Sequence, residues 1–208
     1  MILFFNSNKA WGGGEKWHFE IAKRLQNIGY KVTVLAASKG ELIKKCQKSH
    51  VNNKSVRISN LSFLNFFKLI YYILYFKHLK PTAILLNLPA DLKLAGLAAR
   101  LAGVPNIIYR RGSAIEIKNK WLNRFLFKHI ITSVIANSFE TRQTILKQNK
   151  KLIAFERIHV IHNGIDLYEF DHREFETLYQ RQGNEILIGN AGRLDKQKGQ
   201  QYLIDMAV

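Results

Sequence analysis

Hydrophobic and polar positions alternate along most of the chain between short apolar runs and longer amphipathic segments. Apolar runs of about four to eight residues are typical of buried strands, and the amphipathic segments between them are long enough for crossover helices. This pattern predicts an α/β fold in which helices cover both faces of a mostly parallel sheet. The expected strands span residues 1–6, 30–36, 56–59, 82–87, 106–110, 133–137 and 157–162.

Helix boundaries are marked by residues with restricted backbone preferences. An apolar stripe from Trp17 to Ile28 ends at Gly29, and Pro89 begins a second helical segment that ends at Gly103. A further helix is expected to begin near residue 139, with Ser138 as its N-terminal cap.

The chain changes character after residue 163. Residues 164–183 are polar and charged, and they precede an apolar run, 185–192, that favours a buried strand followed by a turn and a helix opened by Gly199. We therefore expect a first domain over 1–163, a linker over 164–183, and the truncated beginning of a second domain over 184–208. Without its sheet, the last strand would be disordered, dock on the first domain, or pair with a second copy of the chain.

Composition narrows the class of protein and its partners. The 208 residues are 47% hydrophobic, which suits a globular fold, and Cys46 is the single cysteine, which fits a reducing cytosolic location. The first residues match a strand better than a signal peptide, and the longest apolar run is too short to span a bilayer. The formal charge of +17 indicates an acidic partner, whether nucleic acid, anionic lipid or a phosphorylated substrate.

Two glycine-rich turns are candidate phosphate sites. Gly12–Gly14 follow the first strand, where backbone can approach a ligand closely, and Gly192 lies in a turn with Arg193 and Lys198. The first loop has neither the dinucleotide spacing nor a P-loop Gly-Lys-Ser/Thr. The alternative is that the glycines only form tight turns and the cations are solvated.

The fifth expected strand leads into a pair of arginines, Arg110 and Arg111. The carboxyl ends of parallel strands line the ligand crevice of such sheets, so paired guanidinium groups there indicate a grip on phosphate or carboxylate. The alternative is that both belong to the generally basic surface.

Three motifs together resemble the GT-B glycosyltransferases of family 4. They are Gly12-Gly13-Gly14-Glu15 after the first strand, Asn163-Gly164-Ile165-Asp166 at the exit of the first domain, and the Gly192-to-Gly199 segment. The resemblance implies a Rossmann-like first domain and transfer of a sugar, with retention, from a nucleotide-diphosphate sugar to a glycan or lipid-linked acceptor, in lipopolysaccharide or other cell-surface polysaccharide biosynthesis. Arg111-Gly112 stands where many members have His-Gly, and this departure from the family pattern indicates a site that grips an anionic acceptor.

The same resemblance assigns roles to residues. Arg193, Lys198, Gly13 and Gly14 would bind the donor diphosphate. The acceptor would contact Glu15, Arg110 and Arg111, and for the two arginines this role follows from their position at a strand end and not from the family pattern. The family's Glu-x7-Glu segment belongs after residue 208, so the chain alone is expected to be inactive. No cofactor is implied, and no histidine spacing indicates a metal.

Aromatic residues at helical spacing between Phe63 and Lys77 spill onto both faces of one expected helix. The ordinary interpretation is a core helix with one exposed aromatic edge. The alternative is that exposed aromatic side chains with flanking cations enter the interface of an anionic membrane, which would place the protein peripherally at the inner face of the cytoplasmic membrane. Two rival functions remain: a basic nucleic-acid-binding module, although no nucleic-acid motif is present, and another GT-B enzyme that acts on phosphosugars.

Overall fold

The computed structural model describes every residue except 173, 175, 177, 193 and 207–208, and it divides into two compact units. The first unit is Met1–Gly164 and the second is Ile165–Val208.

The first unit is built on a seven-stranded sheet in the order β3-β2-β1-β4-β5-β6-β7. All neighbouring strands pair in parallel, with Ile2 opposite Val32 on one side and Ala83 on the other. The expected parallel fold is therefore confirmed. The strands are β1 Ile2–Asn6, β2 Val32–Ala37, β3 Asn53–Val56, β4 Ala83–Leu86, β5 Asn106–Arg111, β6 Ser133–Ala136 and β7 Ile158–Val160.

Among the strands expected in the first unit, the third was misplaced. It was expected over 56–59 but covers Asn53–Val56, because it lies at the edge of the sheet and its exposed Lys54 and Ser55 give no hydrophobic signal. Polar residues and lysine are common on edge strands, where they discourage pairing with other chains.

Helices and short turns of helix connect the strands. In the first unit they are α1 Gly13–Asn27, α2 Glu41–Lys48, η1 Ser62–Leu64, α3 Phe66–Leu79, α4 Pro89–Asp91, η2 Leu92–Gly96, α5 Leu97–Leu101, α6 Trp121–Phe125, η3 Leu126–Ile130, α7 Phe139–Leu146 and η4 Phe155–Arg157. Segments α4, η2 and α5 run on without a break, as do α6 and η3, and η2 and η3 are π-helical.

The expected helix boundaries are confirmed by backbone geometry. Gly29 and Gly103 have φ angles of 91° and 79°, which glycine adopts without strain. Pro89 occupies the first turn of α4, where its missing N–H costs nothing. The Ser138 hydroxyl accepts a hydrogen bond from the Thr141 amide at 3.0 Å and so caps α7.

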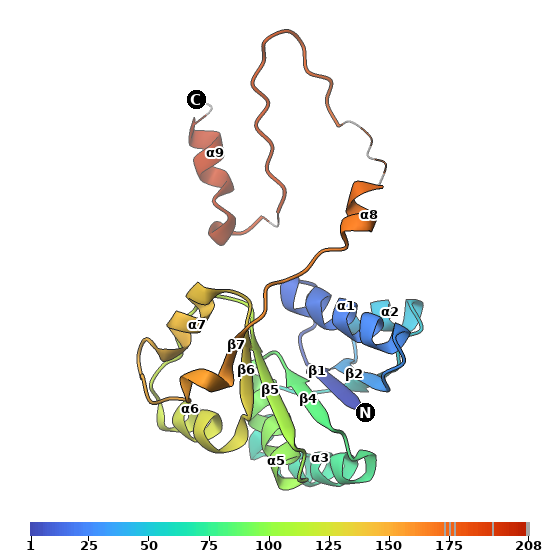
Figure 1. Ribbon diagram of the computed structural model, residues 1–208, viewed down its shortest axis with the longest axis vertical. Helices are drawn as coiled ribbons and strands as arrows, with labels where there is room; N and C mark the ends of the chain where they lie inside the picture. The colour runs from blue at the N-terminus through green and yellow to red at the C-terminus, as the bar shows by residue number, and fades with distance from the viewer. Residues whose placement is uncertain (173, 175, 177, 193, 207–208) are drawn as a thin grey trace. The chain divides into compact units, whose positions relative to one another are not determined.

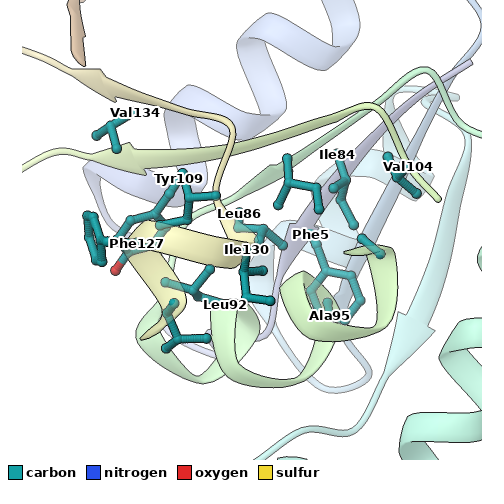
Figure 2. Close-up of a cluster of buried hydrophobic side chains, with 14 of the residues drawn as sticks. Phe5, Ile84, Leu86, Leu92, Ala95, Val104, Tyr109, Phe127, Ile130 and Val134 are labelled. Carbon is teal, nitrogen blue, oxygen red and sulfur yellow. The ribbon is translucent and has the colours of Figure 1, made fainter. Parts of the chain in front are cut away.

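Side chains on the two faces of the sheet form two hydrophobic clusters. Phe4 of β1 packs on the face covered by α1 and α2, whereas its neighbours Leu3 and Phe5 point to the opposite face. Figure 1 shows α1 and α2 on one side of the sheet and α3 and α5 on the other. The larger cluster joins strands β1, β4 and β5 to η2 and η3 (Figure 2).

The two π-helical segments meet at Gly96. A Cβ atom there would lie 2.9 Å from Leu92 Cδ1 and 3.2 Å from Leu86 Cδ1, so only glycine fits without displacing buried side chains. This close approach holds the helix that begins at Pro89 against the sheet, which in turn fixes the position of Asp91 at the carboxyl edge.

The second unit contains three short helical segments among its described residues: α8 Leu167–Asp171, η5 Lys196–Lys198 and α9 Gln200–Met206. The helix expected after Gly199 is present, but the strand expected over 185–192 is not. Those residues form no regular structure, and Ile186 is 88% exposed. A strand is stabilised by hydrogen bonds to a neighbour, and the described residues offer none here.

Among the described residues, no helix combines the length and apolar character needed to cross a bilayer.

Candidate functional site

Six polar side chains gather at the carboxyl ends of β1, β4 and β5, which are neighbours in the sheet. We call them the buried polar cluster: Asn6, Glu15, His18, Asn87, Asp91 and Arg110. All are buried except Asn87, which is half-buried. Burial of so many polar groups is costly unless they satisfy one another, so their contacts define this part of the fold.

Arg110 is the centre of the cluster. Its Nη1 donates to Asn87 Oδ1 and its Nη2 to Asn163 Oδ1, both at 3.3 Å. Its Cζ lies 4.7 Å from the centroid of the Trp17 ring, which is a cation–π contact. Burial lowers the pKa of Arg110, and the nearby Glu15 carboxylate opposes this shift. Arg110 thus ties β5 to the end of β4, to α1 and to the turn after β7.

Glu15 in the first turn of α1 is hydrogen-bonded to the end of β1. Its Oε1 accepts a hydrogen bond from Asn6 Nδ2 at 3.0 Å, and the Asn6 Oδ1 accepts one from the Asn8 amide, also at 3.0 Å. A carboxylate at this position also interacts favourably with the helix dipole. Glu15 and Asn6 therefore fix the loop that joins β1 to α1.

The glycines of this loop face different surroundings. A Cβ atom on Gly14 would lie 2.5 Å from Asn87 Nδ2, so α1 rests directly on the amide that binds Arg110. A Cβ atom on Gly13 would meet nothing within 4 Å, and Gly13 is exposed. Gly14 is required for packing, whereas the surface at Gly13 is open to a ligand.

Asp91 joins the loop after β1 to the helix after β4. Its carboxylate accepts hydrogen bonds from the Ser7 amide, at 3.2 Å to Oδ1, and from the Leu88 amide, at 3.3 Å to Oδ2. Burial raises the pKa of Asp91 to about 7, although these hydrogen bonds oppose the shift. The protonation state of Asp91 therefore changes near neutral pH.

His18 lies one helical turn beyond the glycines and is fully buried. Neither ring nitrogen has a hydrogen-bond partner among the described protein groups, and the ring packs edge-on against Phe4 with centroids 5.4 Å apart. Burial, with a smaller contribution from Arg110, lowers the pKa of His18 to about 3. The imidazole is neutral over the physiological range.

Arg111 lies at the end of β5, outside the cluster. Its Nη2 donates to the Ile115 carbonyl, while its Nε is buried and has no partner among the described groups. The next residue, Gly112, is needed because a Cβ atom there would lie 2.5 Å from Arg110 Nη1. Asn137 at the end of β6 donates through Nδ2 to the Gly112 carbonyl at 3.2 Å.

The structure thus brings together four of the seven residues that the sequence singles out. Gly13, Gly14, Glu15 and Arg110 meet at one edge of the sheet, and Arg111 follows directly. Lys198 is exposed in η5 of the second unit, and Arg193 lies outside the described residues.

Sequence reasoning missed several members of the cluster: Asn6, Asn87 and Asp91. The available signal was that Asn6 and Asn87 each follow an apolar strand run directly, at the edge where ligands bind in parallel sheets. Asp91 carries a weaker signal as the third residue of a helix that begins at Pro89.

Other chemical sites are not apparent in the described part of the chain. No group of three or more potential metal ligands is found there. Burial raises the pKa of the Cys46 thiol to about 11, which disfavours the reactive thiolate.

Solved structures show which class of protein has this fold. The chain superposes on HepE of Anabaena in complex with UDP with a TM-score of 0.65 and 17% identity, over 81% of this chain and 45% of that one. For the glycosyltransferase of Rickettsia africae the TM-score is 0.68 and the identity 20%, over 82% of this chain and 45% of that one. For the lipopolysaccharide outer core galactosyltransferase WaaB the TM-score is 0.59 and the identity 16%, over 79% of this chain and 46% of that one. The first unit has the Rossmann-like fold of the N-terminal part of GT-B glycosyltransferases.

The sequence places the chain in one family within that class. Residues 11–169 match the profile of Glycosyltransferase Family 4, and the chain belongs to this family. It spans about half the length of the solved structures that it matches. No curated protein matches the chain in sequence.

Proposed function

We propose that the protein that carries this chain transfers a sugar, with retention of configuration, from a nucleotide-diphosphate sugar to a glycan or lipid-linked acceptor. The pathway we propose is lipopolysaccharide or other cell-surface polysaccharide biosynthesis, on the cytoplasmic side of the membrane. Membership of Glycosyltransferase Family 4 supports the reaction, and the structural likeness to HepE with UDP supports a nucleotide-sugar donor.

The observation that carries the proposal is the contrast between Gly13 and Gly14. Gly14 is pressed against Asn87, which binds the buried Arg110, while Gly13 stays open on the first turn of a 15-residue helix. A helix start offers unpaired N–H groups and a positive dipole end, and an exposed glycine lets a phosphate approach them. The contacts of the buried polar cluster reach Gly14 and leave Gly13 exposed.

The chemistry that we propose needs no protein nucleophile. Bond cleavage leaves negative charge on the departing nucleoside diphosphate, and fixed N–H groups and cations stabilise that charge as it develops. We assign this role to the Gly13 backbone, with Arg193 and Lys198 as the cations. We assign the sugar end of the acceptor to the side of Glu15, Arg110 and Arg111.

The decisive experiment measures sugar transfer by a protein that contains this chain and has the length of the solved structures that it matches. We expect release of nucleoside diphosphate from a nucleotide sugar when a lipid extract supplies the acceptor, and NMR of the product should show retention. Gly13→Ala should lower kcat/KM at least tenfold without lowering the unfolding midpoint, because its Cβ meets no protein atom. Loss of activity only in step with loss of folding would refute the role of the loop.

The cations have a separate test in the same assay. Replacing Arg193 or Lys198 with alanine should remove about 2–4 kcal/mol of transition-state stabilisation, which is at least a tenfold loss in kcat/KM. Unchanged kcat/KM in both variants would contradict their assignment to the diphosphate.

We further propose that η1 and the start of α3 contact an anionic membrane. Four large apolar side chains are exposed there, Phe67 at 82%, in a segment that also carries Lys68. The other three are Leu61, Leu64 and Phe66. Exposed aromatic and aliphatic groups beside cations favour the interface of an anionic bilayer.

Vesicle sedimentation tests this surface. The chain should bind vesicles that contain phosphatidylglycerol, be released by salt, and bind neutral phosphatidylcholine vesicles weakly. Phe66→Ser with Phe67→Ser should weaken binding, whereas Ile28→Ser with Leu101→Ser, which removes exposed apolar groups elsewhere, should not. Salt-sensitive binding to duplex DNA with no binding to vesicles would favour the nucleic-acid alternative.

A further inference from the structure

A second feature of the carboxyl edge lies on the other side of β1, where the strands β1, β2 and β3 end. A pocket of about 390 Å³ opens there. Its lining includes four cations, Lys9, Lys39, Arg57 and Lys68, and it contains no aspartate or glutamate. We call this the basic pocket.

The position of each cation follows from the topology. Lys9 follows β1, Lys39 follows β2, and Arg57 follows β3, so three adjacent parallel strands each deliver one cation to the same edge. Lys68 comes from the first turn of α3, and its Nζ donates to the Arg57 carbonyl at 3.2 Å. That hydrogen bond fixes one ammonium group beside the others.

The nearby carboxylates do not neutralise these cations. Glu41 is engaged with Lys44, with 2.7 Å between Oε1 and Nζ, and Asp91 is buried and accepts hydrogen bonds from backbone amides. Among the described residues, no ion pair involves Lys9, Lys39 or Arg57. Like charges held together without counter-charge repel one another, and an anion in the pocket would relieve that repulsion.

The pocket also offers neutral donors. Ser7, Ser38 and Ser59 line it, although the Ser7 side chain hydrogen-bonds to Asp91. The Ser59 hydroxyl lies 3.2 Å from the hydroxyl of Ser62. Lysine and arginine with hydroxyl groups are typical donors to phosphate oxygens. Backbone amides contribute less, because the Ser7 amide donates to Asp91 and the Ser38 amide to the Val56 carbonyl.

We propose that the basic pocket binds a phosphate or pyrophosphate group of the acceptor. The pocket lies at the ends of β1, β2 and β3, whereas Gly14 rests against Asn87 at the end of β4, on the other side of β1. Ser7 lines the pocket, and its amide binds Asp91 of the buried polar cluster. A donor at the glycine loop and an anion in the pocket would therefore flank the same strand end. Phosphate binding stands on the pocket alone, while its assignment to the acceptor rests on the proposed sugar transfer.

The first test measures binding of inorganic pyrophosphate to the whole 208-residue chain by calorimetry. Lys39→Gln with Arg57→Gln should raise the Kd at least tenfold. The matched control is Lys31→Gln with Arg100→Gln, which removes the same charge, and there the Kd should change less than twofold. Lys31 precedes β2 and Lys39 follows it, so the control residue lies at the amino end of the strand and the pocket residue at its carboxyl end. Equal weakening by both pairs, or no binding to the wild type, would overturn the proposal.

The second test locates the anion by NMR. Pyrophosphate should shift the amide signals of Ser38, Lys39 and Ile58, and the pocket variant should lose these shifts while its spectrum stays folded. Shifts confined to Gly13 and Gly14 would place the anion at the loop and overturn the assignment. This result is independent of sugar transfer, so it can fail or succeed separately from the proposed function.

The third measurement distinguishes the source of the phosphate. Vesicles of phosphatidylcholine with phosphatidic acid present the group as a lipid headgroup, and Phe67, next to Lys68 in sequence, would bring such a surface close. If pyrophosphate releases the chain from these vesicles and the pocket variant binds them weakly, the pocket takes a lipid phosphate. If vesicle binding is unaffected by either while pyrophosphate still binds, the pocket takes a water-soluble phosphate. Binding to vesicles alone, with no pyrophosphate effect on any pocket amide, would overturn the proposal.

Discussion

The cations on the two sides of the carboxyl end of β1 differ in burial and in hydrogen bonding. On one side Arg110 is buried, donates to Asn87 and Asn163, and stacks on Trp17. On the other side Lys39 and Arg57 are exposed and unpaired in the described structure. A cation whose donors are spent within the protein serves the fold, whereas cations that keep their donors are free to bind a ligand. Charge and position in the sequence do not separate these cases, but contacts do.

Among these variants, Arg110→Ala is expected to lose the most free energy of unfolding. Removal of this guanidinium leaves Asn87 and Glu15 without a cationic neighbour and opens a cavity beside Trp17, so the free energy of unfolding should fall by about 3–5 kcal/mol. Urea unfolding monitored by circular dichroism measures this loss. Arg57→Ala is the matched control and should cost less than about 0.5 kcal/mol. Equal losses in both variants would contradict the structural role of Arg110.

Asp91→Asn tests the cluster through pH. The pKa of Asp91 is raised from 3.8 to about 7, so the folded state keeps the proton while the unfolded chain loses it. Stability from this group is therefore full below pH 3.8 and decreases as pH rises to about 7, by up to about 4 kcal/mol. Asparagine does not ionise, so this pH dependence should disappear.

The measurement for Asp91 is the difference in unfolding free energy between wild type and variant across pH 4–8. A difference is needed because His18, with its pKa lowered to about 3, acts in the opposite sense and loses stability as pH falls below 6.5. We expect the variant to gain on the wild type as pH rises toward 7. A constant difference would mean that Asp91 keeps an ordinary pKa.

Gly14→Ala and Gly13→Ala are expected to affect stability differently, because Gly14 is packed against Asn87 and Gly13 is exposed. The Gly14 variant places a Cβ atom 2.5 Å from Asn87 Nδ2, so Asn87 must move away from Arg110, and we expect a loss of about 1–3 kcal/mol. Gly13→Ala should be neutral or slightly stabilising, because alanine favours helices. Thermal unfolding of the two variants compares them directly, and similar midpoints would refute the close contact at Gly14.

Sequence pattern predicted the elements of this fold better than the site. The central strands were found because their residues are buried on both faces, as in Leu3–Phe5, whereas the edge strand β3 was misplaced because Lys54 and Ser55 look like loop. The run 185–192 has the composition of a buried strand, but strand formation requires a neighbour, which a local pattern cannot supply.

The site was predicted in outline for a different reason. Topology brings strand ends together, so Gly13, Gly14, Glu15 and Arg110 could be grouped from their positions alone. Their roles depend on contacts between distant residues, such as Arg110 with Asn163, that no local pattern encodes. The basic pocket escaped notice for the same reason, because its cations are spread from Lys9 to Lys68 in sequence.

The smallest expected effect on stability belongs to the basic pocket, and its sign is informative. Lys39→Gln with Arg57→Gln removes two cations that have no ion pair in the described structure, so repulsion decreases and the free energy of unfolding should rise by up to about 0.5 kcal/mol. The gain should shrink in 0.5 M salt, because screening weakens repulsion between exposed charges. With pyrophosphate present, the wild type should become more stable than the variant. Pyrophosphate stabilises the wild type by binding its folded state and leaves the stability of the variant unchanged. Thermal unfolding with and without pyrophosphate measures both effects. A variant that is less stable than the wild type in the absence of anion would show that these cations support the fold, as Arg110 does.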